Sequence, residues 1–166
     1  MKIDMPTGWQ LVTASTQDEL FEKLFAVKGC PAVVHLHGIA GPVDVGWWFQ
    51  KSHFFNDCDD ASHHIRVPRL PHERIVRGVI ISGGDSPLHP SWVRSIRDQC
   101  VAAEVPFYFR SWGRYVPVSQ GPLARLIKAE IETFLFEDYY DAGTAYSGSI
   151  LDGQTWTQLP EGVTTR

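Results

Sequence analysis

Short apolar runs alternate with segments of helical periodicity along most of the chain. Four runs are typical of buried strands: residues 9–14, 32–37, 76–81 and 107–110. Apolar residues recur at helical spacing after the first run, at Leu20, Leu24 and Val27. They recur again after the third run, at Val93, Ile96, Cys100 and Ala103. The pattern therefore predicts strands that alternate with amphipathic helices.

Helix boundaries follow from capping residues. Ser15 with Asp18 predicts a capping box at the start of the first helix, and Pro90 fits the first turn of the second. We predict a third amphipathic helix from Leu123 to about Phe136, directly after Gly121-Pro122. The rest of the chain reads as a terminal hairpin or coil.

The alternation indicates an α/β fold with about four mainly parallel strands, in a single domain that spans residues 1–166. Residues 41–74 form a long irregular insertion rich in aromatic and acidic residues, and such insertions are usually functional or mobile. Open sheet edges are rarely left uncovered. Either the insertion and the C-terminal tail cover them, or another chain does.

Composition narrows the functional classes. The chain has 166 residues, 43% hydrophobic and 20% charged, so it can bury a core without disulfides. A formal charge of -4 argues against a phosphate-binding nucleic-acid footprint. No apolar run is long enough to cross a membrane, and the first residues lack the apolar core of a signal peptide. We expect a cytoplasmic protein with no membrane or nucleic-acid partner.

Several motifs carry a resemblance to a known family. They are Gly41-Pro42-Val43-Asp44, Gly83-Gly84-Asp85-Ser86, Arg97-Asp98-Gln99-Cys100, Val105-Pro106-Phe107 through Trp112-Gly113, and Leu151-Asp152-Gly153-Gln154-Thr155-Trp156. In this order they resemble the C-terminal half of a phage-encoded family of radical-SAM-like three-cysteine proteins. The resemblance covers most of the chain. It implies a partial (β/α) barrel, an adenosylmethionine-type ligand, and the host-cell cytoplasm if the chain is phage-encoded.

The cysteines depart from that family. A radical-SAM enzyme holds its cluster through three closely spaced thiolates. Here Cys30, Cys58 and Cys100 lie far apart in the sequence. We therefore expect a truncated or repurposed relative that holds no iron–sulfur cluster and has no radical-SAM activity by itself.

A histidine pair suggests a metal site. His35 and His37 lie two residues apart on one strand and so point to the same side. With Asp85 from a neighbouring strand they make a two-histidine, one-carboxylate set that suits a divalent metal such as iron or zinc. The alternative is that both histidines are hydrogen-bonded core or rim residues. Relatives carry Ser-Cys-Glu-Pro in this strand and turn where this chain has Val34-His35-Leu36-His37-Gly38, so the family's chemistry, which includes that glutamate, does not transfer here.

The Gly83-Gly84-Asp85-Ser86 turn has two interpretations. Its backbone amides can bind an anion, such as the carboxylate of an adenosyl-amino-acid ligand, with help from Arg110 and Trp112. Alternatively it is a tight turn before a helix that Ser86 or Asp85 caps, with Arg110 paired to Asp85.

Aromatic residues in the insertion suggest a partner-binding patch at Trp47, Trp48, Phe54 and Phe55. The alternative is that they pack a flap onto the sheet.

These observations leave three alternative functions. The first is a non-catalytic phage or prophage accessory protein that uses a half-barrel scaffold to bind another protein or a second copy of itself. The second is a small-ligand, adenosylmethionine-like binder or a subunit of a split enzyme. The third is a metal-dependent enzyme that uses His35, His37 and Asp85. No cofactor other than such a metal is expected.

Overall fold

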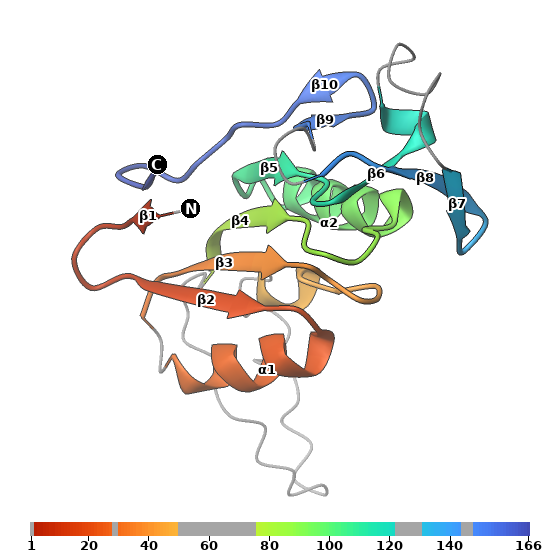
Figure 1. Cartoon of the computed structure of the whole chain (residues 1–166). Helices are drawn as coiled ribbons and strands as arrows, with labels where there is room; N and C mark the ends of the chain where they lie inside the picture. Colours follow the sequence, from red (N-terminus) through yellow and green to blue (C-terminus); the bar gives the residue numbers. More distant parts are fainter. Residues whose placement is uncertain (1, 28–29, 50–75, 122–130, 144–147) are drawn as a thin grey trace, which may run out of the picture.

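The computed structural model describes residues 2–27, 30–49, 76–121, 131–143 and 148–166. Its centre is a four-stranded parallel sheet of strand order β2-β3-β4-β5 (Figure 1). The strands are β2 (Gln10–Ala14), β3 (Ala32–His37), β4 (Val76–Ser82) and β5 (Phe107–Ser111). All four match predicted runs, and none of the sheets formed by the described residues is closed. The structure therefore confirms a mixed α/β architecture with an open parallel sheet.

Two α-helices in the described part of the chain connect these strands. Helix α1 (Gln17–Ala26) follows β2, and helix α2 (Pro90–Ala102) follows β4. Both bury the predicted apolar faces. In the described part of the chain, no helix has the length and apolarity needed to cross a membrane.

The cap of α1 differs from the prediction by one residue. Thr16, not Ser15, is the N-cap, and its hydroxyl oxygen accepts the Glu19 N–H at 3.3 Å. The Glu19 carboxylate in turn accepts from the Ser15 N–H and hydroxyl, at 2.7 and 2.9 Å. A capping box needs its acidic partner at the third helical position, and Glu19 meets this requirement whereas Asp18 does not.

The cap of α2 also differs. His89 is the N-cap, and its ring accepts the Ser91 N–H at 3.2 Å. Pro90 occupies the first turn as predicted. The interpretation in which Ser86 or Asp85 caps this helix is therefore wrong, because both residues lie too far before its first turn.

The two faces of the sheet are covered differently. The main core joins one face to both helices, through Leu20 and Leu24 of α1 and Val93 and Ile96 of α2. On the other face, Val33 and Ile80 pack with residues of the chain ends, namely Ile3, Met5, Trp9, Leu159 and Val163. The chain's own ends thus cover part of the face turned away from the helices.

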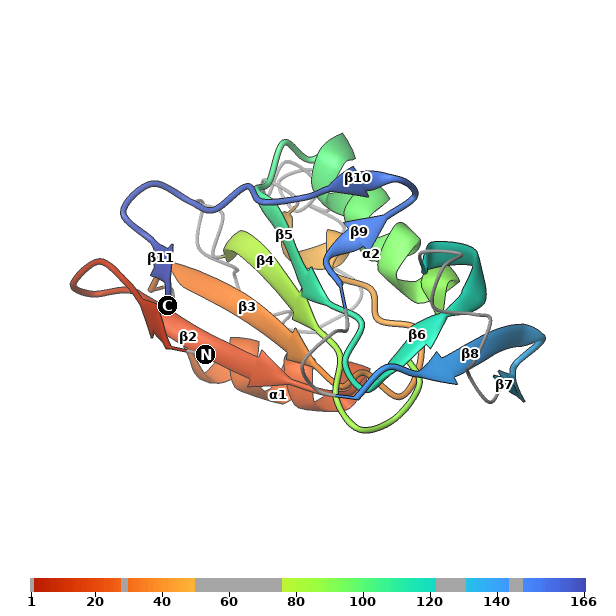
Figure 2. The ribbon, with the colours of Figure 1, turned by 45° about the horizontal axis from the view of Figure 1, so that its top comes forward.

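The C-terminal tail also covers the edge of β5. The Phe109 N–H donates to the Trp156 carbonyl at 2.8 Å, and the Gln158 N–H donates to the Phe107 carbonyl at 3.2 Å. Two short antiparallel pairs complete this region (Figure 2), β9 (Ile150–Leu151) with β10 (Gln154–Thr155), and β1 (Ile3–Asp4) with β11 (Thr164–Thr165). Of the two alternatives left open by the sequence, coverage by the C-terminal tail therefore holds for the β5 edge.

A small antiparallel sheet follows β5. Its order is β6-β8-β7, with β6 (Tyr115–Pro117), β7 (Ile131–Phe134) and β8 (Glu137–Asp141). The predicted helix up to about Phe136 is therefore wrong from Ile131 onward, and its earlier part lies outside the described residues. Pairing with β8 decides this segment, because short apolar stretches fit either helix or strand.

Two 3₁₀ helices complete the description. They are η1 (Gly46–Phe49) and η3 (Val118–Gln120). Of the predicted insertion at 41–74, only residues 41–49 are described.

Candidate functional site

The candidate site lies on the sheet face turned away from the helices. Val34 and Leu36 of β3 are part of the core shared with the helices. Side chains alternate along a strand, so His35 and His37 point to the opposite face. Their rings lie 5.8 Å apart between centroids. The prediction that the two histidines share one side is confirmed.

Ser82 at the end of β4 joins the two histidines. Its hydroxyl lies 2.7 Å from His35 Nε2 and 2.9 Å from His37 Nδ1. Ser82 is only 1% exposed. Burial, followed by the charges of His37 and Arg110, lowers the pKa of His35 to about 4, so this ring is neutral at pH 7. The two imidazoles and the serine form one hydrogen-bonded chain.

A pocket of about 380 Å³ opens beside this chain at the C-terminal ends of the parallel strands. It is lined by His37, Gly83, Gly84, Asp85, Arg110, Ser111, Gly113 and Arg114. We call it the strand-end pocket. Parallel α/β sheets bind ligands at this end because the connecting loops meet there.

Glycines at this end allow three loops to touch. A Cβ on Gly83 would overlap the Trp112 carbonyl, and one on Gly113, where φ is +86°, would overlap the Gly84 carbonyl. A Cβ on Gly84 would lie 3.2 Å from the Cα of Gly38. The Gly83-Gly84 pair is therefore required by close backbone packing between strand ends. It does not form a phosphate-type loop at a helix N-terminus, because α2 begins only at Pro90.

The charges in the strand-end pocket are unevenly paired. Arg114 donates to the Asp141 carboxylate through Nε at 2.9 Å and Nη2 at 2.7 Å. This contact lowers the pKa of Asp141, which is the sign of a favourable pair. Arg110 and Asp85 are both exposed, and neither forms a hydrogen bond or ion pair with another described residue. The pocket thus holds one cation and one anion that form no ion pair with another described side chain, and the charge of Asp85 acts only at longer range, on Arg114.

The predicted ligand residues are only partly brought together. Gly83, Gly84, Asp85 and Arg110 line the pocket, whereas Ser86 and Trp112 do not. Trp112 is 1% exposed and donates its indole N–H to the Ile150 carbonyl at 2.9 Å. Its role is therefore structural. The suggested Arg110–Asp85 pair is not formed.

The predicted metal set of His35, His37 and Asp85 is not assembled as one cluster. In the part of the chain that the structure describes, no group of three histidine, cysteine, aspartate or glutamate residues could hold a metal ion. His35 Nε2 and His37 Nδ1 are both engaged by Ser82, so ligation through them requires displacement of its hydroxyl. Metal binding stays a prediction.

Sequence reasoning missed Ser82, Ser111, Gly113 and Arg114. The alternation of β4 offered a signal for Ser82, which follows Ile80 by two residues and so shares its face. Its register opposite His37 comes from the pairing of β3 with β4. Arg114 carried no signal, because a loop arginine gives no hint of which pocket it will line.

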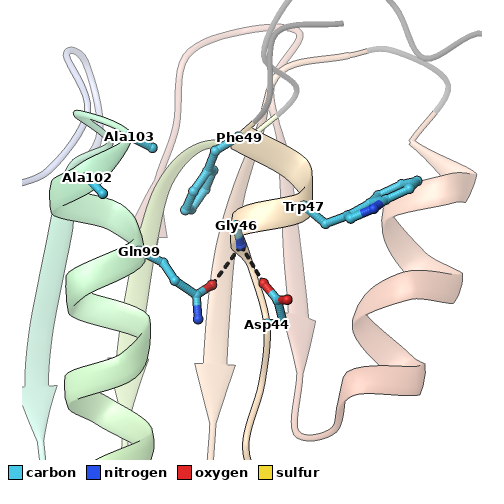
Figure 3. A pocket seen from close by; sticks show the side chains of 7 residues that line it. All are labelled: Asp44, Gly46, Trp47, Phe49, Gln99, Ala102 and Ala103. Carbon is cyan, nitrogen blue, oxygen red and sulfur yellow. Dashed lines mark hydrogen bonds between the residues drawn. The ribbon is translucent and has the colours of Figure 1, made fainter. Parts of the chain in front are cut away.

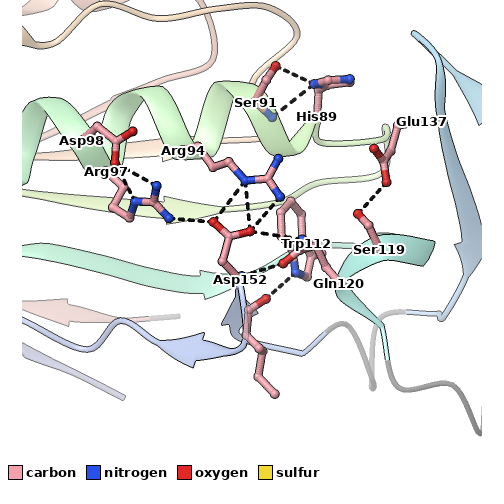
Figure 4. Close-up of polar contacts among 11 residues, drawn as sticks. His89, Ser91, Arg94, Arg97, Asp98, Trp112, Ser119, Gln120, Glu137 and Asp152 are labelled. Carbon is pink, nitrogen blue, oxygen red and sulfur yellow. Dashed lines mark hydrogen bonds and ion pairs between the residues drawn. The ribbon is translucent and has the colours of Figure 1, made fainter.

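Several family-like motif residues turn out to hold elements together. The Asp152 carboxylate accepts from Arg94 Nη2 and Arg97 Nη1 of α2, each at 2.7 Å (Figure 4). The Arg97 guanidinium also lies 5.4 Å from the centre of the Trp156 ring. These contacts fasten the β9–β10 hairpin to α2. These contacts give Arg97 and Asp152, and so the two motifs that contain them, a structural role that needs no bound ligand.

Gln99 has a similar role on the far side of α2. Its Oε1 accepts the Val45 N–H at 2.8 Å and the Gly46 N–H at 2.7 Å, and Figure 3 shows the second of these bonds. A second pocket of about 420 Å³ lies beside these bonds, lined mainly by Trp47, Phe49 and the end of α2. Its two polar side chains, Gln99 and Asp44, already accept backbone N–H groups through Oε1 and Oδ1.

The aromatic residues predicted as a partner-binding patch differ in exposure. Trp48 is 4% exposed and packs edge-on against Phe21 and Phe25 of α1, at 5.4 and 5.0 Å between ring centroids. Trp47 is 38% exposed. Phe54 and Phe55 lie outside the described residues. The described part of this segment packs onto α1 and leaves Trp47 as its exposed ring.

Comparison with known proteins places the chain in a family. No curated protein and no solved structure matches it. The model of the DUF5131 family, described as "Protein of unknown function", matches residues 10–160. This match spans all four strands of the parallel sheet and the strand-end pocket, and the chain therefore belongs to the DUF5131 family.

Proposed function

We propose that the chain binds a small zwitterionic ligand of the amino-acid type, such as adenosylmethionine, in the strand-end pocket. One observation carries the proposal: Arg110 and Asp85 line the same pocket, and neither pairs with another described side chain. An arginine guanidinium recognises a carboxylate through two parallel hydrogen bonds, and an aspartate recognises an ammonium group. A ligand that bears both groups satisfies both residues.

The size and polarity of the pocket agree with this ligand class. Its volume of about 380 Å³ falls within the usual range for small-molecule sites. Arg114 adds little net charge, because Asp141 neutralises it. The serine and glycine lining gives further polar contacts close to the backbone.

The open sheet resembles one arc of a (β/α) barrel in which the C-terminal tail covers the β5 edge, and β2 is the edge at which a separate chain would extend it. Its four parallel strands follow one another in sequence order, and both helices pack on the same side. In a barrel the other side faces the packed interior, and catalytic and binding groups gather at the C-terminal ends of the strands, where the strand-end pocket lies. This arrangement supports a subunit of a split enzyme in the cytoplasm, phage-encoded as the resemblance implies, rather than a radical-SAM enzyme on its own.

Isothermal titration calorimetry with S-adenosylmethionine, S-adenosylhomocysteine and adenosine tests the proposal. We expect the two amino-acid-bearing compounds to bind and adenosine to bind at least about tenfold more weakly, because it lacks both charges. Arg110→Gln and Asp85→Asn should each weaken binding about tenfold or more.

Matched controls are Arg166→Gln and Asp18→Asn, which remove the same charges away from the pocket. Equal affinity for adenosine and adenosylhomocysteine, or unchanged affinity in both pocket variants, contradicts the proposal.

Binding of another protein is a second candidate, favoured by the β7–β8 hairpin. Leu135 and Phe136 form its turn and are 51% and 102% exposed. Residues 131–141 carry four acidic and no basic side chains, namely Glu132, Glu137, Asp138 and Asp141. The partner that fits is a protein with an apolar cleft bordered by lysines or arginines.

A dilution series followed by light scattering separates self-association from binding of a different protein. We expect Phe136→Ser to remove a complex that Thr133→Ser, a control on the same hairpin, retains. A complex that survives Phe136→Ser excludes the hairpin as the binding element.

A further inference from the structure

The Ser82 hydroxyl can donate only one hydrogen, yet it lies within hydrogen-bond distance of two imidazole nitrogens. The distances are 2.7 Å to His35 Nε2 and 2.9 Å to His37 Nδ1. A serine hydroxyl has one donor hydrogen and two acceptor lone pairs. Both contacts are satisfied, and the serine hydrogen is used, when one histidine nitrogen accepts that hydrogen and the other donates its own N–H to the serine oxygen.

Two arrangements satisfy this condition when both rings are neutral. In the first, Ser82 donates to His37 Nδ1 and accepts from His35 Nε2–H, so both rings carry hydrogen on Nε2. In the second, Ser82 donates to His35 Nε2 and accepts from His37 Nδ1–H, so both carry it on Nδ1. Of the two mixed combinations, one sets both ring lone pairs against a hydroxyl that has a single hydrogen. In the other, both rings donate to the serine oxygen, and the buried hydroxyl hydrogen has no acceptor among the described residues. Each mixed combination leaves a buried polar group unsatisfied, so matching tautomers are favoured and the two rings change tautomer together.

Only one of the two rings meets the strand-end pocket. His37 is exposed and lines it, whereas His35 is more buried and does not. With Nδ1 engaged by Ser82, His37 has Nε2 as its remaining polar atom, and this atom lies 3.9 Å from the position of a Cβ on Gly84. A group bound in the pocket thus acts on His37 Nε2, and through Ser82 on His35.

We propose that His37 Nε2 is a ligand-contacting group of the strand-end pocket, and that Ser82 couples its tautomer to that of His35. A carboxylate bound near Arg110 accepts a hydrogen bond from His37 Nε2–H and so selects the Nε2–H form of both rings. A ligand that presents a hydrogen-bond donor to His37 selects the opposite form. The ligand part rests on the proposed function, whereas the coupling rests on the geometry alone.

Nitrogen-15 NMR of the histidine rings tests the coupling without any ligand. At about pH 8, above the ordinary pKa of imidazole, the two rings of the wild-type protein should show the same tautomer. Opposite tautomers in the free protein overturn the coupling. This measurement needs no variant and therefore does not depend on whether a substitution folds.

A carboxylate probe tests the ligand contact. Sodium acetate, which replaces sodium chloride at constant ionic strength, should raise the ratio of Nε2–H to Nδ1–H in both rings. In Ser82→Ala the response of His35 should be lost while that of His37 remains. In Ser111→Ala, which removes a hydroxyl from the same pocket, both responses should remain. An unchanged His35 response in Ser82→Ala overturns transmission through Ser82.

The NMR signal of Arg110 Nε distinguishes failure of the His37 contact from failure of the whole carboxylate site. If acetate shifts this signal but neither histidine, Arg110 binds the carboxylate and the contact to His37 is refuted. If acetate shifts none of the three side chains, the carboxylate site of the proposed function fails as well.

Discussion

Replacement of Asp152 by asparagine should destabilise the chain measurably. The Asp152 carboxylate accepts from Arg94 Nε at 3.0 Å and Nη2 at 2.7 Å, and from Arg97 Nη1 at 2.7 Å. These arginine contacts lower its pKa from 3.8 to about 2. Asparagine keeps the shape of the side chain but loses the charge.

The pKa shift sets the magnitude. The fall of the Asp152 pKa from 3.8 to about 2 corresponds to ~2.5 kcal/mol. The side chain of Asp152 is 34% exposed, so solvent screening reduces this figure. We expect the free energy of unfolding at neutral pH to fall by about 1–2 kcal/mol.

The loss of unfolding free energy in Asp152→Asn should become smaller as pH falls. The folded-state pKa is depressed, so the stabilisation is fully present above the unfolded value near 3.8 and disappears as pH falls through about 2. The difference in unfolding free energy between wild type and Asp152→Asn should therefore be constant from about pH 7 to 5 and be roughly halved near pH 3.

Urea unfolding followed by tryptophan fluorescence measures this difference. The control is Asp98→Asn, which removes a carboxylate 2.8 Å from Arg97 that is 66% exposed. Such an exposed pair should contribute less than about 1 kcal/mol. An Asp152→Asn effect no larger than the control, or one that is independent of pH, refutes the reasoning.

Four further outcomes are expected. Gly83→Ala should cost more than about 3 kcal/mol in urea unfolding, because its Cβ would overlap the Trp112 carbonyl; a loss below about 1 kcal/mol would show that the strand ends can separate. Replacement of Leu135-Phe136, with φ of +48° and +66°, by Asn-Gly should raise the unfolding free energy by about 1–2 kcal/mol, since both residues sit in the left-handed region; unchanged stability would count against strain there. Anaerobic reconstitution should leave the chain without stoichiometric iron and sulfide, and a near-stoichiometric cubane cluster would contradict this. If elemental analysis detects zinc or iron, His35→Ala should abolish the uptake, and retention of the metal would exclude His35 as a ligand.

The helical and strand segments were predictable where the local pattern was long or strongly apolar. The run 76–81 became β4, and the spacing of Val93, Ile96 and Cys100 gave the buried face of α2. Such patterns record which side chains must leave water, and they need no knowledge of the partner element.

The segment at 131–136 was mispredicted because its local pattern is ambiguous. Ile131 and Phe134 are three residues apart, which fits a helix as well as a strand. The pairing of β7 with β8 decides the outcome, and that pairing depends on residues on both sides of an unusual turn.

The candidate site also has a part that the sequence predicted and a part that it did not. Strand alternation alone put His35 and His37 on one side, and the run that ends at Arg110 put this arginine at a strand end. The sequence could not reveal that Ser82 would bridge the two histidines, because the bridge depends on the register between β3 and β4.

The sequence by itself determined the α/β class, the four strands, two helices and the sidedness of the histidines, because each follows from periodicity within a few residues. Only the tertiary structure decided that Gly83-Gly84 serves backbone packing against Trp112, that Asp152 pairs with two arginines of α2, and that Arg110 and Asp85 face one pocket unpaired. These features join residues far apart in the chain. Their contacts depend on how strands and loops approach in space, which no local pattern encodes.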